Sequence, residues 1–262
     1  MFLTDEMPLP RAARGAPSEA GADWIVPQCW ADFTRADHAC WDILFARQKD
    51  FLTTCAVERF NQGIQALRLS DPGIPCFEAL NNRLRPLTGW SVVAVPGLVP
   101  DDVFFALLAA RQFPAGNFIR SADRLDYLEE PDVFHDVFGH VPLLADPAFA
   151  DFMQALGELG RDVTGPAALE RLARLYWYTV EFGLAREAGV PRIYGAGIAS
   201  SLAESRHAID APDCERLPFD LARVMATPYL ADRLQPRYFI IDSFEDMLAL
   251  VSQPGLAAML ES

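Results

Sequence analysis

Residues 130–144 read EPDVFHDVFGHVPLL and contain two of the chain's four histidines, His135 and His140. On an ideal α-helix a separation of five residues turns the side chain by about 500°, which leaves the two imidazoles about 140° apart. One unbroken α-helix would therefore not present both to one metal ion. Gly139 and Pro142 favour a helix that ends here, since glycine suits a left-handed helix end and proline stops continuation. We therefore expect His140 to turn back from a loop.

Two histidines leave a metal ion short of protein ligands, and Glu181 is the best candidate for a third. It lies in residues 175–184, LYWYTVEFGL, among aromatic and aliphatic side chains. An unpaired carboxylate there would be costly or would take up a proton, and coordination to a cation removes that cost. Two neutral imidazoles and one carboxylate, with the remaining positions open, form the ligand set of non-haem iron(II) oxygenases.

Other interpretations stay open on these residues alone. A spaced histidine pair is often structural, and a carboxylate on a helix is usually a solvated surface group. The same three ligands would also suit a zinc hydrolase that activates a water molecule. However, the H-E-x-x-H pattern is absent, because the second histidine comes one residue later and Asp136 stands where the glutamate would be. A catalytically inactive protein that binds an aromatic amino acid is a further alternative.

Composition narrows the classes of partner and the compartment. The net charge of −14 and the pI near 4.6 disfavour nucleic acid and anionic membranes, which attract clustered Lys and Arg. The five cysteines are odd in number and contain no CxxC pair, so we expect neither a disulfide framework nor a zinc ribbon. The N-terminus lacks the pattern of a signal peptide, and no apolar run reaches membrane-spanning length. We expect a cytoplasmic protein.

The hydrophobic pattern predicts a predominantly helical α+β fold with a small sheet. Residues 1–22 lack periodicity and are interpreted as a flexible arm, and residues 23–262 as a single catalytic domain. Thr34 and Asp37 predict a capping box at the start of the first helix. Further helices are expected at 101–113, 132–138, 147–160, 167–188 and 243–251, and short strands at 92–95, 117–120, 193–194 and 239–241.

Three stretches resemble the catalytic domain of the pterin-dependent aromatic amino acid hydroxylases. They are EPDVFHDVFGHVPLL (130–144), YWYTVEFGLAREAG (176–189) and YGAGIASSLAES (194–205), and the resemblance runs from about Trp30 to Val251. It implies an aromatic amino acid hydroxylase-like fold and a site for Fe(II) on His135, His140 and Glu181. These are the ligands that spacing and surroundings had already suggested.

The resemblance also implies the substrate and pterin sites. The amino acid substrate would contact Arg120 through its carboxylate, Trp177 and Phe182 through its ring, and Gly197 and Ser200 nearby. Without the resemblance, Arg120 would be interpreted as a surface ion pair. The tetrahydropterin would lie against Val95, Gly97, Val99 and Phe104, with Asp136, Ala173 and Tyr176 facing them. The chain departs from the animal enzymes at Asp136, where they carry Glu, at Pro114, where they carry His, and at Leu128-Glu129, where they carry Thr-Pro.

The resemblance is closest to bacterial members that act on phenylalanine. It implies hydroxylation of L-phenylalanine to L-tyrosine with O2, in phenylalanine catabolism, and hydroxylation of tryptophan or tyrosine is the alternative. Trp177 occupies a place where the tryptophan-specific members carry Phe. The tyrosine-specific members carry Asp at the position aligned with Ala231, although Asp232 is adjacent. The chain has no room for a regulatory domain before the catalytic one and no heptad helix after Val251, so we expect a monomer.

Overall fold

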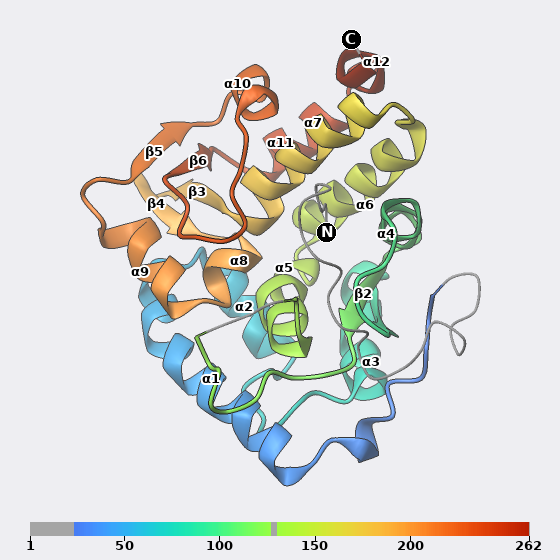
Figure 1. The fold of residues 1–262 in the computed structure, drawn as a ribbon, viewed down its shortest axis with the longest axis vertical. Helices are drawn as coiled ribbons and strands as arrows, with labels where there is room; N and C mark the ends of the chain where they lie inside the picture. Colours follow the sequence, from blue (N-terminus) through green and yellow to red (C-terminus); the bar gives the residue numbers. More distant parts are fainter. Residues whose placement is uncertain (1–23, 127–129, 262) are drawn as a thin grey trace.

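The computed structural model describes residues 24–126 and 130–261. Residues 1–22, predicted to be an arm, and the departure at Leu128-Glu129 lie outside the described residues. Helices surround two small sheets, with α1 along the lower left edge of the view and the larger sheet at the upper left (Figure 1). The predicted fold class, mainly helical with few strands, is confirmed. No helix within the described ranges is both long and apolar enough to cross a membrane.

The long helix α1, Arg35–Cys55, begins at the predicted capping box. The Thr34 side chain accepts a hydrogen bond from the Asp37 backbone N–H, and the Asp37 carboxylate accepts one from the Thr34 backbone N–H. The other α-helices are α2 (Glu58–Ala66), α3 (Phe77–Thr88), α4 (Asp101–Ala109), α5 (Val141–Leu144), α6 (Pro147–Asp162), α7 (Pro166–Tyr176), α8 (Ala196–Ala199), α9 (Leu202–Asp210), α10 (Leu221–Ala226), α11 (Phe244–Val251) and α12 (Leu256–Glu261); η2 (Trp30–Asp32) is a short 3-10 turn.

The strands form two separate sheets. In the smaller, β1 (Ser91–Val95) pairs in parallel with β2 (Gln112–Gly116), so that Val95 lies opposite Gly116. In the larger, the order is β4 (Val190–Ile193), β3 (Gly183–Glu187), β6 (Arg237–Ile241) and β5 (Glu215–Pro218). β3 runs antiparallel to β4 and parallel to β6. The larger sheet therefore joins the segment after Glu181 to the C-terminal part of the chain.

Two π-helices carry the predicted metal ligands. The first, η3, spans Phe134–His140, and the second, η4, spans Trp177–Glu181. In a π-helix the hydrogen bonds join residues five apart, as in the bond from the Phe182 N–H to the Trp177 carbonyl at 2.8 Å. Residues five apart thus lie about one turn from each other on the same side. This geometry, and not a break, brings His135 and His140 to one face.

The expected helix end at Gly139 and Pro142 is therefore wrong. Gly139 does not adopt a positive φ, and η3 continues directly into α5, which has Pro142 at its beginning. Gly139 is needed for another reason: a Cβ there would lie 2.9 Å from the Ala196 carbonyl oxygen of α8. A close approach between η3 and α8, not backbone flexibility, requires the glycine.

Two other expected elements change identity along their length. The helix expected over 101–113 ends at Ala109, Arg111 adopts a left-handed φ of 56°, and residues 112–116 become β2, while 117–120 form no strand. The helix expected over 167–188 ends at Glu181, and residues 183–187 become β3. In both cases a partner strand far along the chain pairs with the segment and overrides its local helical tendency.

Close helix packing fixes the position of α4 against α6. Gly157 and Gly160 lie on the α6 face that meets α4, and a Cβ on Gly157 would come within 2.3 Å of the Ala109 backbone nitrogen. Only glycine allows this approach, because the contacted atom is main chain and cannot rotate away. α4 also carries Phe104, one of the residues predicted to contact the pterin.

We expect Gly157→Ala to destabilise the protein by about 1–3 kcal/mol, because overlap with the α4 backbone outweighs the gain of up to about 1 kcal/mol in helix propensity. Urea denaturation followed by circular dichroism measures the change. Glu158→Ala, at the neighbouring exposed position of α6, is the matched control and should alter stability by less than about 0.5 kcal/mol. A Gly157→Ala protein as stable as wild type would contradict this packing argument.

Candidate metal centre and active site

The three side chains selected as metal ligands meet in the fold. The ligand atoms of His135, His140 and Glu181 all lie within 4.8 Å of one another. The Glu181 oxygens lie 3.5 Å from His135 Nε2 and 3.2 Å from His140 Nε2, and the two imidazole rings stand nearly perpendicular with centroids 5.2 Å apart. The η3 and η4 turns thus aim three donor atoms at one point.

The protonation states suit a cation. Burial lowers the pKa of His135 to about 4, so its imidazole is neutral at pH 7 and offers a lone pair. Burial alone would raise the pKa of Glu181, but His140 and His135 outweigh it and lower the pKa to about 2. The donor set is therefore a neutral imidazole and an ionised carboxylate beside a second imidazole.

The spacing of the donor atoms also fits one metal ion. Nitrogen and oxygen ligands bind first-row divalent metals at about 2.0–2.2 Å, so neighbouring donors of one ion lie about 3 Å apart. The His140 to Glu181 and His135 to Glu181 distances of 3.2 and 3.5 Å are close to this value. The Glu181 side chain keeps 16% of its surface exposed, which leaves an approach for other ligands. The residues present could hold an iron(II) or zinc ion.

Neighbouring groups hold His135 in place. Its Nδ1 shares a hydrogen bond of 2.9 Å with the Ser200 hydroxyl, and its backbone N–H donates to the Asp132 carboxylate at 2.9 Å. A hydrogen bond at the second ring nitrogen fixes the orientation of a metal-binding imidazole. The His140 ring packs against Phe113 at 4.7 Å, and its Nδ1 has no hydrogen-bond partner within the described part of the chain. Ser200, predicted to lie near the substrate, thus contacts a candidate ligand directly.

Arg120 forms a buried ion pair, not a surface pair. Its Nε and Nη2 donate to the two oxygens of Asp132 at 2.8 and 2.9 Å, and the exposed fractions of the two side chains are 8% and 0%. The same Asp132 carboxylate caps the first turn of η3 through His135. Sequence reasoning missed Asp132, although a carboxylate three residues before a candidate ligand is the signal of such a cap. Arg120 is therefore fixed relative to the metal ligands.

The predicted aromatic residues form one wall beside the ligands. The Trp177 and Phe182 rings lie 4.5 Å apart, and a Cβ on Gly197 would come within 2.7 Å of the Phe182 ring. Tyr229, which the sequence did not single out, stacks on Trp177 with centroids 4.3 Å apart. Gln235 accepts a hydrogen bond from the Trp177 Nε1 at 3.0 Å. No local sequence pattern singled out Tyr229 or Gln235, since both belong to an irregular segment far from η4 in sequence.

The residues predicted for the pterin are brought together in part. The Phe104 and Tyr176 rings meet edge to face at 5.5 Å, and Asp136 accepts a hydrogen bond of 2.7 Å from the Gly116 N–H, opposite Val95 on β1. Burial raises the pKa of Asp136 well above its usual value. Val99 belongs to the same buried hydrophobic cluster as Val95, Phe104 and Tyr176, Ala173 is buried on α7, and Gly97 is half-buried. An aromatic face and a buried carboxyl group suit a flat heterocycle with N–H donors.

The other two histidines have structural partners. His38 Nδ1 accepts a hydrogen bond from the Ile74 N–H at 3.0 Å, and its ring packs beside Trp30. His207 Nε2 lies 3.0 Å from the Gln235 carbonyl oxygen. Both imidazoles therefore hold local structure in the fold.

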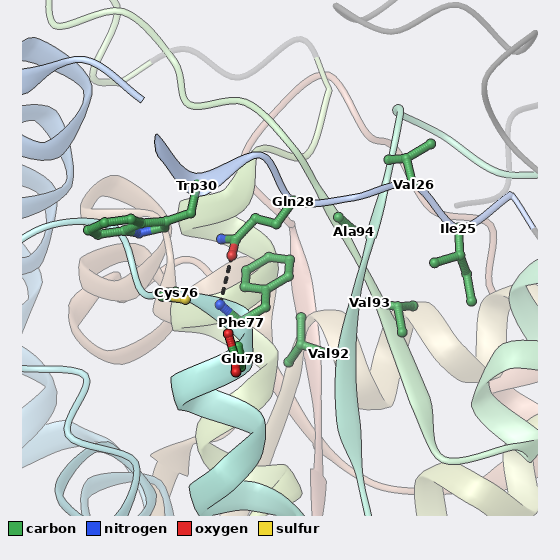
Figure 2. A pocket seen from close by; sticks show the side chains of 10 residues that line it. All are labelled: Ile25, Val26, Gln28, Trp30, Cys76, Phe77, Glu78, Val92, Val93 and Ala94. Carbon is green, nitrogen blue, oxygen red and sulfur yellow. Dashed lines mark hydrogen bonds between the residues drawn. The ribbon is translucent and has the colours of Figure 1, made fainter. Parts of the chain in front are cut away.

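A hollow of about 370 Å³ lies apart from the predicted site residues, between Ile25–Trp30, the start of α3 and β1 (Figure 2). The Gln28 amide spans it, donating to the Pro75 carbonyl and accepting from the Phe77 N–H at 2.7 Å. Both ends of this amide are thus hydrogen-bonded, and the remaining lining is mostly apolar, with the Cys76 thiol and the Glu78 carboxylate as its other polar groups.

Comparisons with known proteins agree with this geometry. The Phenylalanine-4-hydroxylase of Caulobacter vibrioides is 55% identical over 235 residues, covering 90% of this chain and 80% of that protein. The relative of the same name from Ralstonia nicotianae is 52% identical, covering 92% and 76%. The phenylalanine hydroxylase structure from Chromobacterium violaceum with bound iron(III) and oxidised 7,8-dihydrobiopterin has a TM-score of 0.87 at 46% identity, covering 92% of this chain and 88% of that one.

The match to a described family covers most of the chain. Residues 25–255 match the family described as biopterin-dependent aromatic amino acid hydroxylase. This range includes both π-helices and every predicted site residue. The chain belongs to the biopterin-dependent aromatic amino acid hydroxylase family.

Proposed function

We propose that this chain hydroxylates L-phenylalanine to L-tyrosine with O2 and a tetrahydropterin at a mononuclear Fe(II) site. The observation that carries the proposal is the convergence of His135, His140 and Glu181. The Glu181 oxygens lie 3.5 Å from the Nε2 atom of His135 and 3.2 Å from that of His140. Family membership and the close relatives named phenylalanine-4-hydroxylase support the choice of reaction and substrate. The product would serve phenylalanine catabolism.

Fe(II) and the reduced pterin, when bound, supply the activation of O2. The chain's part is to hold the metal from one side through three donors, which leaves the opposite side for the reactants. The burial of His135 and His140 limits the access of bulk water, which would otherwise compete at the reacting centre, to the partly exposed side of Glu181.

Arg120 keeps donors free for a substrate carboxylate. A guanidinium carries five N–H donors. Asp132 takes one from Nε and one from Nη2, and the Leu125 carbonyl takes one from Nη1 at 3.2 Å, so one N–H on each terminal nitrogen remains. Asp132 thus orients the guanidinium, and the two remaining N–H groups would bind the amino acid carboxylate. Because Asp132 also caps η3, the substrate's carboxylate would be held at a fixed position relative to the metal ligands.

The wall made by Trp177 and Phe182, with Gly197 behind Phe182, would receive the substrate ring. Ser200 would lie beside it while it orients His135. The pterin would lie against Phe104, Val95, Gly97 and Val99, with Asp136, Tyr176 and Ala173 opposite.

A zinc hydrolase is a weaker candidate for the same ligands. Its general base would have to be Asp136, but an oxygen of that carboxyl group already accepts the Gly116 N–H at 2.7 Å. An inactive binding protein would need none of the three ligand positions.

We propose further that residues 23–262 form one catalytic domain that acts as a cytoplasmic monomer. The buried core runs continuously from Cys40 to Leu260, which supports a single domain. The five cysteines are all free, as is usual in a reducing compartment. Sedimentation velocity measures the assembly state.

Anaerobic reconstitution with Fe(II), followed by addition of O2, a tetrahydropterin and phenylalanine, tests the reaction. We expect tyrosine to form in proportion to the pterin oxidised, and phenylalanine to outcompete tryptophan and tyrosine. Chromatography of the products gives both quantities. Preferred turnover of tryptophan or tyrosine would reassign the substrate, and pterin-independent hydrolysis with Zn²⁺ would favour the hydrolase.

Replacing any metal ligand should remove the metal. We expect His135→Ala, His140→Ala and Glu181→Ala each to lose bound iron and at least about a hundredfold of the activity, because two donors cannot retain the ion. Metal analysis after gel filtration measures the iron. His38→Gln is the matched control, since a glutamine can still accept from the Ile74 N–H, and its iron content should equal that of wild type.

We expect Asp132→Asn to raise the KM for phenylalanine and also to lower the melting temperature of the metal-free protein, because the Arg120 guanidinium would remain buried without its counter-charge. The amide keeps the shape of Asp132 but loses the charge that orients Arg120, which costs about 1–3 kcal/mol for a charge-assisted hydrogen bond. Steady-state kinetics and thermal melting measure the two effects. Arg47→Ala is the control, because it removes an ion pair with the exposed Asp126 that does not involve Arg120. An unchanged KM in Asp132→Asn would contradict the role of the pair.

A further inference from the structure

Gln235 is a buried amide that joins the aromatic wall to a distant part of the fold. Its side chain is 1% exposed, and its Oε1 accepts the Trp177 Nε1–H at 3.0 Å. Its Nε2 donates to the Leu230 carbonyl at 2.7 Å and to the Arg233 carbonyl at 3.1 Å. Both hydrogens of the amide are thus used inside one loop, and the oxygen is used on the indole. This fixes which end of the amide faces Trp177.

The backbone of Gln235 is anchored independently of its side chain. Its N–H donates to the Glu204 carboxylate at 3.1 Å, and its carbonyl lies 3.0 Å from His207 Nε2. Glu204, on α9, also accepts the hydroxyl of Tyr238 on β6. A substitution of the Gln235 side chain therefore leaves these anchors, and the two roles are separable by experiment.

The loop that Gln235 closes lies along the indole of Trp177. Tyr229 stacks on this ring with planes 17° apart, and the Tyr178 hydroxyl donates to the Pro228 carbonyl at 2.9 Å. Phe182 contacts the indole as well, with ring planes tilted by 34°. Rotation of Trp177 about its side-chain bonds would break both the stack and the hydrogen bond to Gln235. Since aromatic side chains have broad torsional preferences at the ring, these contacts decide its plane.

We propose that Gln235 is a positioning residue that sets the plane of the Trp177 indole. The orientation of the indole in turn determines where the substrate's aromatic ring binds. The inference rests on the proposed function for its substrate, but the hydrogen bond on which it depends exists without substrate. Gln235 itself acts through Trp177. A residue that only held the loop folded would change the amount of active protein, whereas a positioning residue changes how the substrate ring is placed.

Gln235→Met tests this, because methionine has a similar length, lacks the amide and keeps the backbone anchors. We expect the KM for phenylalanine to rise by about three- to tenfold, the range that loss of the one hydrogen bond to Trp177 predicts. The variant also loses the bonds to the Leu230 and Arg233 carbonyls, so its effect is compared with that in the Trp177→Phe background. The tyrosine formed per pterin oxidised should fall, because a misplaced ring lets the pterin react without hydroxylation. A purely structural role would lower kcat alone and leave the KM and this ratio unchanged, which would overturn the proposal.

Matched variants separate the hydrogen bond from the loop. Arg233→Ala removes an exposed side chain paired with Asp232 and keeps the carbonyl that Gln235 uses, so it should match wild type in KM and coupling. Trp177→Phe removes the indole N–H, and Gln235→Met added to it should produce a much smaller KM change than it does alone. Equal effects of Gln235→Met in both backgrounds would overturn the proposal.

The indole proton gives a readout that needs no turnover. The sample is the whole chain, labelled with 15N and free of metal, and the Trp177→Phe variant assigns the Trp177 indole resonance. We expect this resonance to lie downfield of that of Trp41. The buried Nε1 of Trp41 has no hydrogen-bond partner among the described residues, whereas that of Trp177 donates to Gln235. Gln235→Met should shift the Trp177 resonance upfield; if that variant does not fold, the wild-type comparison with Trp41 still decides. A wild-type enzyme inactive on phenylalanine but with the downfield resonance would refute the proposed function and leave the hydrogen bond standing. No downfield shift would refute this inference.

Discussion

A largely buried carboxylate beside two imidazoles is the constraint around which this molecule is arranged. Glu181 lies among apolar side chains, where an isolated negative charge is unfavourable, and only its neighbours His135 and His140 compensate for it within the described structure. A divalent cation at their common point would satisfy all three. The fold provides this arrangement through two π-helical turns, each placed against the other by α8 and the larger sheet.

The same region couples the predicted binding functions to one another. Asp132 joins the first turn of η3 to Arg120, so the group that would bind the substrate carboxylate cannot move independently of His135. Ser200 connects His135 to the segment after α8. Trp177 lies in the same short π-helix as Glu181, so the wall for the substrate ring and the third ligand share one backbone. Local covalent connection thus gives the site much of its rigidity.

The parts that were predictable from sequence are those encoded within a few residues. The capping box at Thr34, the strand at 92–95 and the helix after Ser243 depend on local residue types, and all are present. The segments 112–116 and 183–187 were mistaken for helix. Their parallel partners, β1 and β6, are separated from them in sequence and leave no local pattern, but the turn at Ala188-Gly189 that joins β3 to β4 is a local hairpin signal that was overlooked.

For the site, the sequence by itself determined the chemistry: two histidines and a glutamate in apolar surroundings define a donor set for a divalent metal, whatever the fold. Only the tertiary structure decided how His135 and His140 reach one face, since the i to i+5 hydrogen bonding of η3 follows no periodicity visible in the sequence and accompanies the close packing against α8 that Gly139 permits. It also decided the roles of Asp132 and Gln235. A hydrogen bond between residues 58 positions apart, such as that of Trp177 with Gln235, depends on the folded path of the whole chain.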